Sequence, residues 1–398
     1  MESSEMRALQ PERKANKVLR RLVLVAVGIG MAWLLAEILL RVTFEALPPK
    51  VQGDIQQVRR VPWSDETIVP VMPFTIDRDF QVRMPVGLKD YPVRWSDARF
   101  AFETISAWEN HRAGLRSEPP VYPLDIITFG DSFTFCWVKW EACYVKLISA
   151  EGWHTFNAAI PGTGTTGQLA LISELVPAMK PRLVIWQWYN NDLSDNYDLA
   201  RIRDEVGELE TAPADDPVLP PQGLAQYSAV IQLLSVTLNP PRRSTPYQHF
   251  WEVRYQGRPL LVHSNEYPYA TTFVYPRTQY GWERGLAAQE EGHRLIRDQL
   301  GAKLMLIILP TKEEAYAKVL EPVIGKPYLD QMAESREKLL ATCVEKGWYC
   351  LDPLPAFREA ITKGETIYYA FDSHLDESGN QILSALVKDF IKQHQLLE

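Results

Sequence analysis

The sequence predicts an α/β fold, a three-layer α/β/α sandwich around a five-stranded parallel sheet, preceded by one N-terminal transmembrane helix. From residue 124 onward, short apolar runs alternate with helical stretches, a pattern typical of βαβ units. These runs are continuous rather than alternating, which indicates strands covered on both faces. Near the N-terminus, residues 22–40 form an apolar stretch long enough to cross a bilayer.

Each element of the sandwich has its own segment of sequence. The expected strands are LDIITF (124–129), HTFNAA (154–159), LVIWQW (183–188), KLMLIIL (303–309) and GWYCL (347–351). The expected helices lie at about 141–150, 166–179, 224–236, 286–300, 329–346 and 376–394. The gap between the third and fourth strands is too long for a plain crossover, so we expect an insertion or cap at about 195–300. This insertion either shapes a substrate cleft or has no role in binding the substrate.

The apolar stretch carries one charge, Glu37, and is expected to be an uncleaved signal anchor. The basic residues before it are Arg7, Arg13, Lys14, Lys17, Arg20 and Arg21, whereas the near flank after it holds Arg41 and Lys50. The positive-inside rule therefore predicts a cytoplasmic tail (1–21), a single-pass helix (22–41) and an extracytoplasmic remainder, periplasmic or extracellular. A cleaved signal peptide is disfavoured because no small-x-small site lies between Ala36 and Pro48. Glu37 and Arg41 either pair at i, i+4 or reach the interface separately.

Composition narrows the classes of partner and cofactor. Net charge is −8 without a basic stripe, so no nucleic-acid partner is expected. Seven histidines are scattered and no HExxH or CxxC spacing occurs, so neither a metal nor another cofactor is expected. Four cysteines form two local pairs, Cys136 with Cys143 and Cys343 with Cys350. They are either disulfides, of a connectivity that sequence leaves open, or four buried thiols.

Candidate catalytic residues follow the expected strands. Ser132, in IITFGDSFTF, ends the first strand, where ligands bind in an open parallel sheet. A serine hydroxyl needs a base, and His374 is the best candidate, with Asp372 two residues earlier to fix its tautomer. Acyl transfer also needs donors for an oxyanion. Gly162, in IPGTGTTG, and Asn191, in WYNND, follow the next two strands and are expected to supply them.

These blocks, in this order, resemble the SGNH hydrolase superfamily, also called GDSL-type esterases. GDSFTF, NAAIPG, YNND and FDSH match the family's four blocks over about residues 121–394, with a weaker echo in ENHRAGLRSEPP upstream. The resemblance implies an SGNH or flavodoxin-like fold, Ser132 as nucleophile, His374 and Asp372 as its partners, and an oxyanion hole from Ser132, Gly162 and Asn191. The short Asp-x-His spacing and LPTKEEAY (309–316) resemble membrane-linked members, including those that acetylate exported polysaccharides.

The expected domains are therefore the tail, the helix, a stalk and lead-in segment (42–120) and a hydrolase-like domain (121–394). The expected function is a membrane-anchored serine esterase or deacylase acting on an acyl ester, borne by a glycan or a lipid. The alternatives are an O-acyltransferase that modifies an envelope or exported polysaccharide, and a non-catalytic envelope scaffold. Protein partners and oligomeric state are left open.

Three local patterns have competing interpretations. Residues 162–167, GTGTTG, satisfy a dinucleotide-binding GxGxxG, but such a site normally uses the first strand–helix turn, which here is GDS. Trp137 and Trp140 either line a cleft or pack in the core. Lys312 and Glu313, in PTKEEAY, either reach the site edge or form a solvated helix start, and we favour the solvated start.

Overall fold

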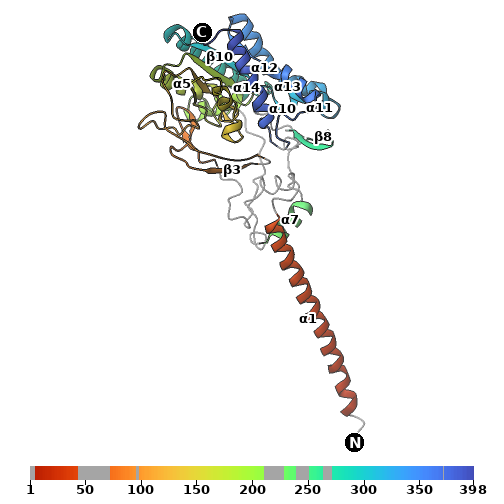
Figure 1. Ribbon diagram of the computed structural model, residues 1–398. Helices are drawn as coiled ribbons and strands as arrows, with labels where there is room; N and C mark the ends of the chain where they lie inside the picture. Colours follow the sequence, from red (N-terminus) through yellow and green to blue (C-terminus); the bar gives the residue numbers. More distant parts are fainter. Residues whose placement is uncertain are drawn as a thin grey trace. The chain divides into compact units, whose positions relative to one another are not determined.

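The computed structural model describes residues 5–43, 72–95, 98–209, 228–238, 251–262, 271–370 and 372–398. The chain divides into two compact units, Met1–Ile68 with Val218–Arg242, and Val69–Pro217 with Arg243–Glu398. The described part of the first unit consists of α1 (Glu5–Val42) and α7 (Ala229–Leu238), and the second unit holds the sheet (Figure 1). Residues 44–71 of the expected stalk and lead-in segment lie outside the described ranges.

The central sheet has five parallel strands in the order β11-β10-β7-β5-β6. The strands are β5 (Ile126–Phe129), β6 (Thr155–Asn157), β7 (Leu183–Trp188), β10 (Lys303–Ile308) and β11 (Tyr349–Leu351). All five lie within the predicted segments, and β5 and β7 are buried at every position. The prediction of a doubly covered parallel sheet is confirmed.

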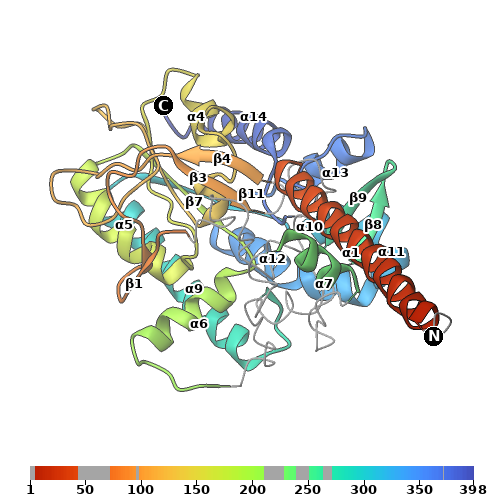
Figure 2. The ribbon, with the colours of Figure 1, turned by 90° about the horizontal axis from the view of Figure 1, so that it is seen from below.

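Helices cover both faces of this sheet, in three layers. The helices on one face are α5 (Thr165–Met179), α9 (Pro276–His293) and α12 (Lys326–Lys346), and those on the other are α4 (Tyr144–Ser149), α13 (Leu354–Thr362) and α14 (Glu377–Gln393). Side chains alternate along β7, so Val184 and Trp186 enter the first core and Leu183 and Ile185 the second. In Figure 2, α4 and α14 lie on one side of the strands and α5 and α12 on the other.

The last part of the expected insertion belongs to the sandwich. Helix α9 packs against α5 and α6 (Asp192–Ile202). Its glycines permit this close approach, because a Cβ at Gly281 would overlap the carbonyl of Leu193 and one at Gly292 would overlap the ring of Trp186. Earlier in the same segment, β8 (Trp251–Tyr255) and β9 (Arg258–Val262) form an antiparallel hairpin. Residues 210–227, 239–250 and 263–270 lie outside the described ranges.

The described part of the segment before the sheet is antiparallel and contributes to the core. It contains the hairpins β1 (Thr75–Asp77) with β2 (Gln81–Arg83) and β3 (Tyr91–Trp95) with β4 (Ala98–Phe102). Phe80, Phe100 and Phe102 are buried in the same cluster as Phe129 of the sheet. Phe102 also meets Phe135 edge-on, at a ring-centroid distance of 5.0 Å.

The remaining described elements are short. They are α3 (Ser132–Phe135), the 3-10 turn η2 (Trp140–Ala142), the π-helical turn η4 (Arg294–Gln299), α10 (Lys312–Ala315) and α11 (Ala317–Ile324). The cysteines pair locally, Cys136 with Cys143 and Cys343 with Cys350. The structure thereby selects one connectivity from those that the sequence left open.

Candidate active site

Three of the predicted site residues follow adjacent strands. Ser132 follows β5, Gly162 follows β6 and Asn191 follows β7, and β5 lies between the other two strands in the sheet. Because the strands are parallel, their carboxyl ends lie at one edge, and the loops that follow them meet there. The fold thus brings residues 132, 162 and 191 to the same edge.

Ser132 is the first residue of α3. Asp131 caps this helix, because its carboxylate accepts a hydrogen bond from Phe133 N at 2.9 Å. Gly130, just before it, has φ of 157° and no room for a side chain, since a Cβ would lie 2.7 Å from Thr134 Oγ1 and closer still to Gln187. The GDS tripeptide is therefore a tight strand-to-helix turn that leaves Ser132 half-buried.

Ser132, His374 and Asp372 form a continuous chain of hydrogen bonds. His374 Nε2 lies 2.7 Å from Ser132 Oγ, and His374 Nδ1 lies 2.6 Å from Asp372 Oδ1. Asp372 Oδ1 also accepts the backbone N–H of His374 at 2.8 Å. The carboxylate therefore fixes the ring so that Nδ1 carries the hydrogen and Nε2 is left to accept one from the serine.

Aromatic side chains pack on the imidazole. The Trp137 ring stacks on it with centroids 4.7 Å apart and an interplanar angle of 16°, and Phe133 lies at 4.9 Å. Trp137 is buried, whereas Trp140 is half-buried. Trp137 thus adjoins the site as a support for His374, and it is fixed further by the hydrogen bond that Tyr369 Oη donates to its carbonyl at 2.9 Å.

The two expected oxyanion donors differ in their surroundings. Gly162 has φ of +72°, a left-handed conformation that favours glycine. The Asn191 side chain donates from Nδ2 to Asp195 Oδ2 at 3.0 Å. Nδ2 carries two hydrogens, so this bond orients the amide and leaves the second hydrogen for another acceptor. Asp195 is an orienting partner that sequence analysis missed, and its i, i+4 spacing from Asn191 on a helix was the available signal.

Buried carboxyl groups surround this amide. Asp131 and Asp192 are buried, and Asp195 is half-buried. Burial raises the pKa of each, to about 8 for Asp195, and their mutual repulsion adds to the rise for Asp192 and Asp195. Asp192 accepts a hydrogen bond from Thr165 Oγ1 at 2.9 Å. Burial therefore favours the protonated form of these carboxyl groups more than water would.

Lys312 is the main correction to the sequence analysis. The expected solvated helix start is wrong, because Lys312 and Glu313 are both fully buried. Lys312 Nζ donates to the carbonyls of Tyr369, Ala370 and Asp372, at 2.6, 3.0 and 3.0 Å. The ammonium thereby holds the loop that carries two members of the hydrogen-bonded chain.

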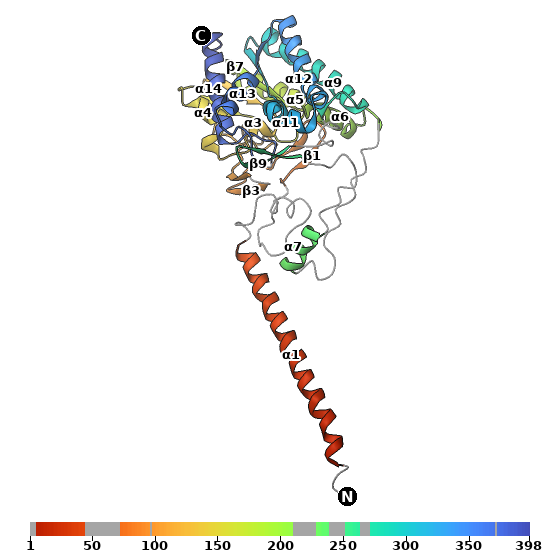
Figure 3. The same ribbon diagram turned by 90° about the vertical axis from the view of Figure 1, so that its right-hand side faces the viewer.

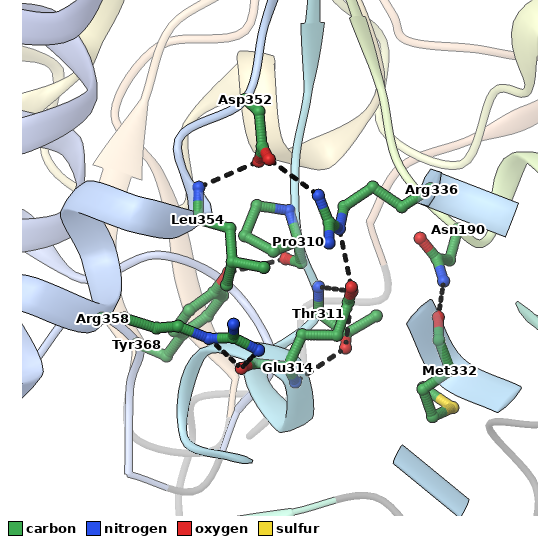
Figure 4. Close-up of polar contacts among 10 residues, drawn as sticks. All are labelled: Asn190, Pro310, Thr311, Glu314, Met332, Arg336, Asp352, Leu354, Arg358 and Tyr368. Carbon is green, nitrogen blue, oxygen red and sulfur yellow. Dashed lines mark hydrogen bonds and ion pairs between the residues drawn. The ribbon is translucent and has the colours of Figure 1, made fainter. Parts of the chain in front are cut away.

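A buried polar network fixes the helix on which Lys312 sits. Glu314 closes a capping box with Thr311, and Arg336 donates to Glu314 Oε1 at 2.6 Å and to Asp352 Oδ2 at 2.9 Å. Figure 4 shows these contacts together with Arg358, which donates to the Glu314 carbonyl, and Tyr368, Asn190 and Met332. Burial raises the pKa of Glu314 and its partner Arg336 opposes that rise. The network anchors α10 to α12 and α13.

A second buried cation holds the other side of the site. Arg116 donates to the carbonyls of Phe135 at 3.0 Å and Val138 at 2.7 Å, and also to that of Cys136. Its guanidinium lies over the Phe135 ring, and burial lowers its pKa to about 9. Arg116 lies in the ENHRAGLRSEPP segment, so the upstream echo marked a residue that shapes the loop after Ser132.

The competing glycine-rich interpretation does not fit the structure. A Cβ at Gly164 would lie 2.8 Å from Asn196, and one at Gly167 would overlap the carbonyl of Phe80. These glycines are therefore packed against protein rather than open to a pyrophosphate. Within the described ranges, no group of three His, Cys, Asp or Glu side chains is arranged to hold a metal ion.

Comparisons with known proteins give structural similarities at low identity. No family model matches the chain, and no curated protein matches its sequence. A putative acylhydrolase from Bacteroides fragilis is 12% identical, with a TM-score of 0.35 over 73% of this chain and 92% of that one. A GDSL-like lipase from Bacteroides thetaiotaomicron is 12% identical, with a TM-score of 0.35 over 68% and 88%. A catalytic mutant of an acetylxylan esterase from Geobacillus stearothermophilus is 16% identical, with a TM-score of 0.36 over 68% and 94%.

Proposed function

We propose that this chain is a membrane-anchored, extracytoplasmic serine esterase that cleaves an O-acyl ester. The observation that carries the proposal is the hydrogen-bonded series Ser132 Oγ, His374 Nε2, His374 Nδ1 and Asp372 Oδ1, with distances of 2.7 and 2.6 Å. This geometry activates a hydroxyl as nucleophile, and its position at the carboxyl edge of a parallel sheet leaves it accessible to a ligand.

The reaction proceeds by acyl transfer through the serine. His374 Nε2 takes the proton from Ser132 Oγ as the oxygen attacks the ester carbonyl, and Asp372 stabilises the imidazolium that forms. The backbone N–H groups of Ser132 and Gly162, with the Asn191 amide, are assigned to the developing oxyanion. His374 then protonates the leaving alcohol, and an acyl-enzyme remains on Ser132. Attack by water, with His374 again as base, releases the acid.

Two further features support an extracytoplasmic location. The helix Leu19–Val42 is long and apolar enough to cross a membrane, and its apolar window is not buried against the rest of the protein. Two disulfides support an oxidising compartment. A reporter enzyme that is active only outside the cytoplasm is expected to be active when it is fused after Glu398, whereas one that is active only in the cytoplasm is expected to be inactive there. Activity of the cytoplasm-dependent reporter in this fusion would contradict the proposed topology.

Labelling with a fluorophosphonate tests the nucleophile. Wild type is expected to label covalently, Ser132→Ala to lose labelling, and Asp372→Asn to label at least about a hundred times more slowly because the imidazole tautomer is no longer fixed. Equal labelling of Ser132→Ala, or no labelling of a folded wild type, refutes the assignment. The latter outcome supports the non-catalytic alternative, in which the fold is kept without turnover.

Transfer to a hydroxyl instead of water is the alternative second step. The same triad supports it, because only the acceptor that attacks the acyl-enzyme differs. Incubation with an ester donor and a glycan, followed by mass spectrometry, separates the two. Free acid as the sole acyl product supports hydrolysis, and acylated glycan supports an O-acyltransferase.

A further inference from the structure

Glu37 is the single charge within residues 22–40, and the structure gives it a set of partners. Its carboxylate accepts hydrogen bonds from the backbone N–H groups of Ala229 and Val230, at 2.6 and 3.1 Å, and from Ser228 Oγ at 3.0 Å. Arg41 completes the cluster at 2.9 Å. The Glu37 side chain is 13% exposed, although most of the apolar side chains of α1 are exposed.

These partners form the beginning of α7. The first N–H groups of any helix lack acceptors inside the helix. Here Glu37 satisfies two of them, and Ser228 Oγ accepts the next, from Ile231 N, at 3.2 Å. In water such groups bind solvent, but in a bilayer each unpaired group costs several kcal/mol. A capping carboxylate supplied by the apolar helix itself is what an environment poor in water requires.

The sequence of α7 fits the same environment. AVIQLLSVTL carries no charge over ten residues, and at about 1.5 Å per residue it is too short to cross a bilayer. Leu234 and Leu238, four residues apart on one side of α7, are 45% and 73% exposed, so the described part of the chain leaves much of their apolar surface uncovered. Figures 1 and 3 show α7 beside the C-terminal end of α1.

The contact also sets a depth. Glu37 precedes Val42, the end of the apolar span, by five residues (42 − 37), which is about 8 Å of helix. Helices that lie in the membrane interface bury their apolar face to a depth of roughly 5–10 Å. With Val42 at the membrane surface, the beginning of α7 would lie at the level of the boundary between headgroups and acyl chains.

We infer that α7 is an interfacial helix that places its leucine face in the bilayer leaflet at the C-terminal end of α1, docked there by Glu37. This inference rests on the membrane anchoring proposed above. Its consequence follows from connectivity. The chain leaves the catalytic unit after Pro217 and re-enters it at Arg243, so α7 ties that unit to the membrane at a second place in the sequence.

Lipid quenching of site-specific probes tests the inference. The full chain, with its four cysteines in disulfides, receives one extra cysteine, is labelled with an environment-sensitive fluorophore, and is placed in phosphatidylethanolamine–phosphatidylglycerol nanodiscs. The probe positions are Leu234→Cys on α7, Leu34→Cys in the span, and Leu209→Cys in the catalytic unit, which are 45%, 60% and 41% exposed. Probes at 34 and 234 are expected to be quenched by spin-labelled lipids, whereas the probe at 209 is not.

The outcomes separate the two proposals. If only the probe at 34 is quenched, the anchor stands and the interfacial helix is refuted, whether water or a second copy of the chain covers α7. If neither probe is quenched, the anchor and the inference both fail. The probe at 234 is further expected to respond more to labels placed near the headgroup than to labels placed deep in the acyl chain.

Substitution of Glu37 tests the docking contact. Glu37→Ala removes every acceptor, and the docked-to-undocked ratio at position 234 is expected to fall about fivefold, the usual effect of losing a helix cap. Glu37→Gln keeps one carbonyl oxygen as an acceptor, so its docked-to-undocked ratio is expected to lie between those of wild type and Glu37→Ala. Quenching at 34 and hydrolysis of a soluble ester are expected to be unchanged. Unchanged quenching at 234 in Glu37→Ala refutes docking by Glu37.

Discussion

Replacing Lys312 by methionine removes a buried ammonium while keeping a side chain of similar length. Three carbonyls, those of Tyr369, Ala370 and Asp372, then lose the donor that lies 2.6 to 3.0 Å away. A buried acceptor that loses its donor costs about 1–3 kcal/mol, a half-buried acceptor costs less because water reaches it, and removal of the charge recovers its desolvation cost. We therefore expect a net loss of about 3 kcal/mol in the free energy of unfolding, near the lower end of the summed range.

Activity is expected to fall further than stability alone explains. The loop held by Lys312 carries Asp372, and a displacement of about 1 Å in a catalytic group costs roughly a hundredfold in rate. The assays are urea unfolding and hydrolysis of a small soluble ester at a temperature where the variant is folded. We expect kcat to fall about a hundredfold with KM nearly unchanged. The low-field proton signal of the His374–Asp372 hydrogen bond is expected to shift or broaden.

Lys363→Met is the matched control for this change. Lys363 is 63% exposed and pairs with Glu359 on the surface of α13, so its loss is expected to change stability by less than about 0.5 kcal/mol. The reasoning is refuted if folded Lys312→Met keeps kcat within twofold of wild type. It is also refuted if the two lysine variants are equally stable.

Three further predictions concern pH and disulfides. Burial raises the pKa of Asp195 to about 8 in the folded state, from a value near 4 in the unfolded state. Asp195 therefore lowers the free energy of unfolding as pH rises from 4 to 8. In Asp195→Asn, the slope of the free energy of unfolding against pH, measured by urea unfolding, is expected to be less negative by up to about 1.4 kcal/mol per pH unit. Burial lowers the pKa of His293 to about 4. Its contribution to the free energy of unfolding is therefore complete above pH 6.5 and is lost as pH falls. Between pH 7 and pH 5, the free energy of unfolding of His293→Phe is expected to fall by about 2 kcal/mol less than that of wild type. An equal pH dependence in wild type and variant would contradict either assignment. Replacing both cysteines of Cys136–Cys143 by alanine is expected to cost about 2.5 kcal/mol by loop entropy and to lower kcat, because this loop follows Ser132. The same change at Cys343–Cys350, which has the same spacing, is expected to cost similar stability with kcat retained, and a parallel loss of kcat would show a general effect.

The sequence predicted the parts of the fold that local pattern determines. The five strands were found because buried parallel strands are continuous apolar runs, and Ser132, Asp372 and His374 because each follows such a run or precedes a helix. Their meeting, across 242 residues between Ser132 and His374, is confirmed by the structure. Their catalytic role remains a prediction.

The errors and omissions concern long-range polar contacts. Lys312 in PTKEEAY has the composition of a solvated helix start, and its acceptors lie 57 to 60 residues later in a loop whose path a single sequence does not reveal. The two disulfides were left open for a different reason, since spacing permits several pairings. The Glu37 contact with Ala229 spans 192 residues and was equally hidden.

The buried guanidinium of Arg116 has a practical consequence for where a truncated form of the chain should begin. It grips the loop after Ser132 from a segment that precedes the first strand of the sheet, and Phe80 and Phe100 of that segment share the sheet's core. A fragment that starts at residue 121 would lack both the Arg116 hydrogen bonds and the aromatic rings, and we expect the loop after Ser132 to lose its fixed position. Residues 72–95 and 98–120 thus help to build the candidate site, and we expect a fragment to keep that site intact only if it contains them together with the sheet.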